Sequence, residues 1–315
     1  MIYSPRTHLR ASLQKRRRKG AALLAVLWVI ALLIVVVGSV STLLTPDIEM
    51  SGTRRQVFRA RLLAESGLAL ALHPDVKPDD PILFREVAPG EGYKVTVIGE
   101  DSRLNPNVLL ERQDRDTLRR VFRFWGLDLL QQDALINYLI DWVDPDNAVQ
   151  NPGAEQRAYG RKDMPFNRPF RSVEEMSLVK GMQDVERLYP NWRDWFSVYA
   201  SGVLDVNEAA PEVLSAVTGA DIASCQRLRA RRLGRDGIPN TKDDAPVTDI
   251  QTAISLLGTS TNNPQQLSSI LSVTSTTRRI LCTAQAGDTT RELGVVVQGA
   301  PGQAVSGQML WLGEK

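Results

Sequence analysis

The feature that most constrains this chain is a basic cluster followed directly by a long apolar run. Residues 15–19 read Lys-Arg-Arg-Arg-Lys, residues 21–37 are all apolar, and no charged residue follows until Asp47. About 20 apolar residues are enough for a helix to cross the hydrocarbon core of a bilayer, so this segment is long enough to span a membrane. Because basic residues favour the cytoplasmic side, the chain after Asp47 is predicted to lie outside the cytoplasm.

Three kinds of N-terminal processing are compatible with this segment. A secretory signal peptide would have a shorter apolar core and a cleavage site of small residues, for which residues 38–41 are the candidates. A plain signal anchor would keep residues 1–20. The basic leader that ends at Gly20 instead resembles the class III signal of type IV pilins and pseudopilins. That resemblance implies that prepilin peptidase cuts between Gly20 and Ala21 and methylates the new N-terminus.

The helical pattern continues beyond the apolar run. Between Asp47 and Leu72, apolar residues recur at helical spacing, with arginines on the other faces. The sequence therefore predicts one helix of about 50 residues, on the order of 75 Å long at 1.5 Å per residue. Since proline lacks the backbone donor of a helix interior, a kink is expected at Pro46.

Charge and composition limit the functions that are expected of the rest of the chain. The first 20 residues hold seven basic residues and no acidic one, which leaves 31 basic against 36 acidic residues in the remainder. An acidic body is a poor non-specific binder of nucleic acid, so no nucleic-acid partner is expected. His8 and His73 are the only histidines and no P-loop occurs, so the chain is not expected to be an enzyme.

The two cysteines, Cys225 and Cys282, are too few for a disulfide framework or a structural zinc site. They could pair in an oxidising compartment, but the sequence does not fix the distance between them, and the pairing stays open.

Extended segments flank a long helical block. Residue alternation predicts strands at 82–87 and 93–100, joined by a hairpin through Gly90. Helices are expected at 118–125, 127–142, 172–179, 184–188, 211–217 and 222–232, and further strands at 279–286, 291–298 and 308–312. The expected fold class is α+β, with a large helical domain inserted into one small antiparallel sheet that packs on the N-terminal helix.

This order of segments, together with several short motifs, resembles the minor pseudopilin K family of the type II secretion system. The motifs are Leu139-Ile140-Asp141-Trp142-Val143-Asp144-Pro145-Asp146, Gly153-Ala154-Glu155, Tyr159, Asn167-Arg168-Pro169-Phe170 and Val179-Lys180-Gly181-Met182. After cleavage at Gly20 the fifth residue is Ala25, where major pilins and most pseudopilins have a glutamate. The K family is similar in having an apolar residue there, which implies a subunit with no other subunit above it.

The resemblance implies a domain plan, a location and a function. The plan is a leader at 1–20, a transmembrane pilin helix at 21–73, sheet segments at 74–105 and 273–315, and the inserted helical domain at 106–272. The implied protein is a single-pass protein of the bacterial inner membrane with a periplasmic C-terminal domain. It would join the I and J minor pseudopilins at the pseudopilus tip, act with the major pseudopilin, and support export of folded proteins. A minor pilin of a type IV pilus or DNA-uptake system is the alternative.

Two clusters of oxygen ligands are candidate metal sites. Calcium takes six to eight oxygens, commonly from carboxylates on a loop. The first cluster comprises Asp141, Asp144, Asp146 and Glu155, and the second comprises Asp236, Asn240, Asp243 and Asp244. The residues alone leave solvated capping carboxylates or a flexible acidic loop as equal alternatives, whereas the family resemblance implies bound calcium in the helical domain.

Two segments resemble the turns of helical hairpins, residues 179–182 and 218–221, each with one glycine. Such turns present backbone amides to phosphate in DNA-binding proteins. Arg227, Arg229, Arg231 and Arg232 follow the second turn, but an exposed, solvated helix face is the favoured interpretation of these arginines. The hairpins are expected to pack helices together or to contact protein partners.

Overall fold

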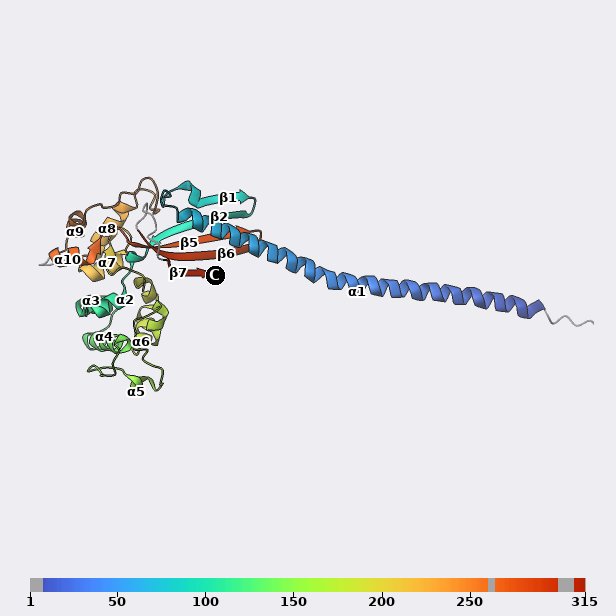
Figure 1. Ribbon diagram of the computed structural model, residues 1–315, viewed down its shortest axis with the longest axis horizontal. Helices are drawn as coiled ribbons and strands as arrows, with labels where there is room; N and C mark the ends of the chain where they lie inside the picture. The colour runs from blue at the N-terminus through green and yellow to red at the C-terminus, as the bar shows by residue number, and fades with distance from the viewer. Residues whose placement is uncertain (1–7, 260–263, 300–308, 315) are drawn as a thin grey trace, which may run out of the picture. The chain divides into compact units, whose positions relative to one another are not determined.

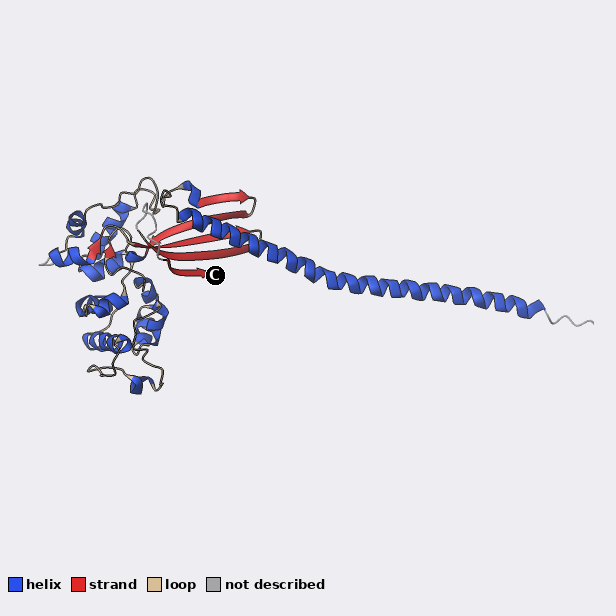
Figure 2. Ribbon diagram, viewed as in Figure 1, coloured by secondary structure: helices blue, strands red, loops and turns tan. Residues whose placement is uncertain are grey.

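The computed structural model describes residues 8–259, 264–299 and 309–314, and it contains one small antiparallel sheet and many helices (Figures 1 and 2). These elements confirm the expected α+β class. The chain divides into two compact units, residues 1–59 and residues 60–315.

The first helix, α1, is longer than predicted. It runs over His8–Ala71, so it begins inside the basic leader and continues past Pro46. The side chains at residues 23–37 are exposed, and Ala25 is one of them. The predicted cleavage site, Gly20 and Ala21, lies where the structure describes the helix but not the exposure of its residues. In the part of the chain whose side chains the structure describes, no helix is both long enough and apolar enough to span a membrane.

Five strands form the main sheet in the order β1-β2-β5-β6-β7, all paired antiparallel. They are β1 (Phe84–Ala88), β2 (Glu91–Gly99), β5 (Thr277–Ala286), β6 (Thr289–Gln298) and β7 (Met309–Glu314). β1 begins two residues later than predicted, because Pro81–Leu83 forms a 3-10 helix, η1. Asp80 Oδ1 caps this helix by accepting from the Ile82 amide. The predicted hairpin is present, with Gly90 at a φ of 73°.

The last turns of α1 pack on this sheet and make its core. The core contains Ala64, Leu68 and Ala71 from the helix, together with Tyr93, Val95, Ile280, Cys282 and Val295 from the strands. A Cβ at Gly67 would lie 2.6 Å from Cys282 Sγ and 2.8 Å from Tyr93 Cδ2. Only glycine therefore lets the helix approach the sheet this closely.

A helical domain fills the chain between β2 and β5 and has a separate core built on Trp142, Trp192 and Phe122. Its α-helices are α2 (Pro106–Glu111), α3 (Arg115–Phe124), α4 (Leu129–Val143), α5 (Gln156–Tyr159), α6 (Met182–Leu188), α7 (Pro211–Thr218), α8 (Ile222–Arg232), α9 (Ile250–Leu257) and α10 (Pro264–Ile270). Three 3-10 helices, η2 (Glu100–Ser102), η3 (Val173–Leu178) and η4 (Pro190–Trp195), and the short parallel strands β3 (Leu204–Asp205) and β4 (Leu271–Ser272) complete it. The helix predicted at 172–179 is thus present as the 3-10 helix η3.

Cys225 and Cys282 are both buried and free. Cys225 lies in the core of the helical domain and Cys282 in the core of the sheet. The disulfide between them, which the sequence left open, is therefore not formed.

Candidate functional site

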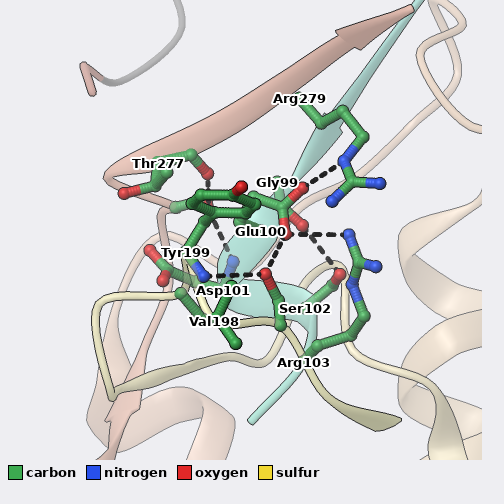
Figure 3. A network of polar contacts seen from close by, with 12 residues as sticks. Gly99, Glu100, Asp101, Ser102, Arg103, Val198, Tyr199, Thr277 and Arg279 are labelled. Carbon is green, nitrogen blue, oxygen red and sulfur yellow. Dashed lines mark hydrogen bonds and ion pairs between the residues drawn. The ribbon is translucent and has the colours of Figure 1, made fainter. Parts of the chain in front are cut away.

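Two buried carboxylates lie where the chain leaves the sheet for the helical domain (Figure 3). Glu100 and Asp101 follow β2 directly, in η2, and neither is exposed to solvent. Glu100 Oε1 accepts from Arg279 Nε at 2.5 Å and Glu100 Oε2 pairs with Arg103 Nη2 at 3.0 Å. The Ser197 hydroxyl also donates to Glu100. One carboxylate therefore joins η2, β5 and the segment that follows η4.

Asp101 connects the segment that leaves the sheet after β2 to the segment that returns to it before β5. Its Oδ1 accepts from the Ser201 amide at 2.6 Å, and its Oδ2 accepts from the Thr276 amide at 2.8 Å. Its own amide donates to Ser275 Oγ at 3.2 Å. Because Ser275 and Thr276 lie just before β5, Asp101 holds the end of β2 against the start of β5.

Further acidic groups lie near this junction. Glu208 Oε2 accepts from the Gly99 amide at 2.5 Å, and Asp205 Oδ1 accepts from the Asn207 amide at 2.9 Å. Burial raises the pKa of Asp205 to about 7, and the neighbouring Glu208 and Asp101 add to the rise. Burial also raises the pKa of Glu208.

A cavity of about 300 Å³ lies beside the junction. Its walls carry both signs of charge, with Arg103, Arg193 and Arg279 against Glu174 and Asp194. Since the arginines already pair with Glu100 and Glu186, the cavity has no clear preference for an anion or a cation.

The first predicted metal cluster surrounds the C-terminal end of α4. Asp141 is fully buried and accepts from two loop amides, Gln150 at 3.1 Å and Ala154 at 2.7 Å. A Cβ at Gly153 would collide with the Asp141 carboxylate, so glycine lets the loop close over it. Asp141 therefore shapes the loop and has few lone pairs left for a ligand.

Asp144 and Glu155 differ from Asp141 because their buried oxygens have no donor. Asp144 Oδ1 and both carboxylate oxygens of Glu155 are buried without a hydrogen bond. Burial raises the pKa of each to about 6, with further contributions from Asp146 and Asp141 for Asp144, and from Asp141, Asp144 and Asp146 for Glu155. The structure thus brings these four predicted residues within electrostatic reach of one another.

Asn167, which the sequence did not single out as a ligand, adds a fourth acceptor of this kind. Its Oδ1 is buried without a donor, and its Nδ2 donates to the Asp146 carbonyl at 2.8 Å. Buried acceptors without donors suit a cation with oxygen ligands. In the described part of the chain, however, no three His, Cys, Asp or Glu side chains already stand close enough to hold a metal ion. Binding would need Asp144 and Glu155 to move.

The second predicted cluster uses its carboxylates to hold its own loop. Asp243 Oδ2 accepts from the Arg235 amide at 2.6 Å, and Asp236 Oδ1 accepts from the Ile238 amide at 2.8 Å. Hydrogen bonds from Thr241 and from the loop amides lower the pKa of Asp243 to about 2. Asp244 Oδ2 accepts from the Asn240 amide, and only its Oδ1 is buried without a donor. These internal bonds account for the order of the loop.

Both predicted hairpin turns are turns between helices. Gly181 starts α6 with a φ of 88°, and Gly219 ends α7 with a φ of 73°. Asp221 is the N-cap of α8, and its negative charge next to the helix start disfavours a phosphate there.

The comparisons with known proteins agree with this architecture. Residues 102–199, from η2 to the segment after η4, match the family described as "Type II secretion system (T2SS), protein K". The fold is similar to one chain of the crystal structure of the GspK-GspI-GspJ complex from the enterotoxigenic Escherichia coli type 2 secretion system, with a TM-score of 0.64 and 16% identity over 84% of this chain and 99% of that chain. No curated protein matches the chain. The resemblance seen in the sequence is confirmed: residues 102–199 match the type II secretion system protein K domain, and the fold of the chain is similar to that of a chain in a solved GspK-GspI-GspJ complex.

Proposed function

We propose that this protein is a minor pseudopilin at the tip of the type II secretion pseudopilus. There it primes assembly of the filament and supports export of folded proteins across the outer membrane. The observation that carries this proposal is the family match at residues 102–199, which falls within the helical domain inserted between β2 and β5. The similar chain in the solved complex assembles with GspI and GspJ, so minor pseudopilins of those two types are the proposed partners here.

The tip position follows from two features of the chain. Ala25 stands where a glutamate would neutralise the N-terminal amine of an adjacent subunit, so this chain does not supply that charge. The inserted domain also adds a second hydrophobic core to the subunit. A bulky domain is difficult to accommodate along a closely packed filament and easy to accommodate at its end.

The proposed anchoring uses the N-terminal sequence. Prepilin peptidase would cut after Gly20, and residues 21–46 would hold the chain in the inner membrane as part of a pilin-type helix. The packing of residues 60–71 on the sheet supports the pilin-like plan for the body.

Calcium is the proposed cofactor of the helical domain. The donor-free oxygens of Asp144, Glu155 and Asn167 fit a hard cation, with Asp146 and Asp141 beside them. A bound calcium ion would neutralise the repulsion among these carboxylates and tie α4 to the loop before α5. The loop of Asp236, Asn240, Asp243 and Asp244 is the weaker candidate because its carboxylates already accept from backbone amides.

The N-terminus tests the proposal most directly. We expect protein isolated from membranes to start at N-methylated Ala21 when prepilin peptidase is present, and at Met1 when the peptidase gene is deleted. Intact mass and N-terminal sequencing measure this. Loss of exoprotein secretion on deletion of the chain's gene, restored by the native chain, tests the secretion role separately. A start at Met1 with active peptidase, or a cut near Ser41, would contradict the pseudopilin assignment.

A further inference from the structure

Arg278 is a buried arginine near the start of β5. It is only 3% exposed, and it forms the last pair of the β2–β5 ladder with Gly99 and lies opposite Val297 of β6. Alternate residues of a strand point to the same face, and the next two on this face, Ile280 and Cys282, belong to the apolar core between the sheet and α1. A guanidinium group therefore lies on the buried face of the sheet, at the end of that core.

The guanidinium group of Arg278 has no counter-charge among the described residues. Its Nε and Nη2 are both buried without a hydrogen-bond acceptor. Burial lowers the pKa of Arg278, and no carboxylate contributes to offset this. Arg103 differs, because burial lowers its pKa but Glu100, at 3.0 Å, acts in the opposite direction. Since an unbalanced buried charge is strongly destabilising, Arg278 requires an anionic group that the described residues do not supply.

The two nitrogens without acceptors form one edge of the guanidinium group. Nε–H and the neighbouring Nη2–H point in parallel, so together they bind two oxygens of a single anion. Arg161 uses this edge for Asp163, with Nε to Oδ1 at 3.2 Å and Nη2 to Oδ2 at 2.8 Å. Among the arginines whose side chains the structure describes, Arg278 alone has both atoms of this edge buried without an acceptor, whereas Arg120 and Arg291 have only Nε in that state.

We propose that Arg278 binds a small inorganic oxyanion, such as phosphate or sulfate, through its Nε and Nη2. Phosphate and sulfate offer two oxygens to the two parallel donors, which a chloride ion does not. A carboxylate of a partner protein fits less well, because a side chain that is 3% exposed offers no surface on which a second chain can dock. The bound ion would balance the buried charge at the start of β5 and stabilise the folded body. This inference is independent of the secretion role.

The test compares thermal melting of the full chain in detergent with phosphate, sulfate or chloride at equal ionic strength. We expect the native chain to melt about 5 °C higher in phosphate than in chloride once phosphate reaches about 100 times its dissociation constant. Arg278→Met removes the donors and should leave only the general stabilising effect of phosphate and sulfate as excluded salts. The matched control Arg85→Met removes an exposed arginine of the same sheet and should keep the full rise.

A second variant keeps the test decisive if Arg278→Met does not fold. Arg278→Lys retains a positive charge but loses the two parallel donors, so phosphate binding should weaken about tenfold. Equilibrium dialysis with radiolabelled phosphate measures this and should find one ion per native chain, displaced by sulfate but not by an equal concentration of chloride. A rise in phosphate that is equal in the native chain and in Arg278→Met, or phosphate binding that Arg278→Lys leaves unchanged, would overturn the proposal.

Discussion

A single buried carboxylate, Glu100, neutralises two guanidinium groups where sheet and helical domain meet. Its partners Arg103 and Arg279 come from different elements, and the carboxylate itself is fully excluded from water. In such an arrangement the loss of the acid removes the carboxylate that pairs directly with two partly buried cations. The residue therefore matters more for stability than an exposed ion pair would.

We expect Glu100→Gln to lower the free energy of unfolding by about 3 to 5 kcal/mol, since a neutral amide cannot balance Arg103 and Arg279. Thermal melting of the full chain in detergent measures this. The matched control is Glu186→Gln, which removes the half-exposed partner of Arg193 and should cost less than about 1 kcal/mol. Equal effects of the two changes would contradict the role given to Glu100.

Asp205 predicts a pH dependence of stability. Its pKa of about 7 in the folded chain lies above the ordinary value of about 4 for an unfolded chain, so the folded state holds the proton more tightly. This contribution is fully present below about pH 4 and is lost as the pH rises through 7. The charged groups that act on it are Glu208, Asp101 and Arg232.

We therefore expect the native chain to melt at a higher temperature at pH 5 than at pH 8, and Asp205→Asn to reduce that difference. The variant keeps the acceptor for the Asn207 amide and should be at least as stable as the native chain at pH 8. Melting curves of both chains across this pH range give the comparison. An unchanged pH dependence in the variant would show that Asp205 does not hold the proton.

The donor-free oxygens of Asp144 and Glu155 predict a calcium effect. Calcium at 100 times its dissociation constant would stabilise the folded chain by about 2.7 kcal/mol, and a chelator would remove this. Asp144→Asn with Glu155→Gln should abolish the difference between calcium and chelator. It should not lower the melting temperature in chelator, because the repelling buried charges are gone.

The control for the calcium effect is Asp163→Asn with Asp184→Asn, which changes two carboxylates that pair with exposed arginines in the same domain. Its melting temperature should still depend on calcium. A native chain that melts identically with calcium and with chelator would exclude the site.

At the scale of elements, the contact of α1 with the sheet depends on one small residue. Gly67→Ala would place a Cβ within 2.6 Å of Cys282 Sγ, and relief of that overlap requires the helix to move away from the sheet. We expect a loss of about 1 to 3 kcal/mol, measured by thermal melting. Gly52→Ala in the same helix has no atom within 4 Å of the added Cβ and should be neutral or stabilising by about 0.5 to 1 kcal/mol. Destabilisation by both changes would point to the helix backbone instead of the contact.

The sequence predicted elements best where patterns were strong and local. The bounds of α8 match the prediction of 222–232, because its start and its end are both marked by polar residues. The helix predicted at 172–179 is present as a 3-10 helix, a type that periodicity does not distinguish from an α-helix over so few residues. The strands β3 and β4 were missed because pairings of two residues with partners 67 positions away leave no local pattern.

At the scale of the molecule, the sequence predicted the insertion of helices between two parts of one sheet. The calcium site at the C-terminal end of α4 stays a prediction. The sequence did not predict the role of Glu100 and Asp101. Two adjacent acids after a strand resemble an ordinary polar turn, and their partners lie about 100 and 175 residues away along the chain. Buried polar contacts of that separation are created by tertiary packing alone.

The position of Asp101 has a mechanical consequence. The helical domain hangs from β2 and β5, which are neighbours in the sheet, so a force on the domain would pull this pair apart from one end, one hydrogen bond at a time. Strand pairs loaded in this way separate easily. The hydrogen bonds that Asp101 donates to Ser275 and accepts from Thr276 close the pair at the end where separation would begin. A force applied to the domain must break these hydrogen bonds of Asp101 before β2 and β5 can separate.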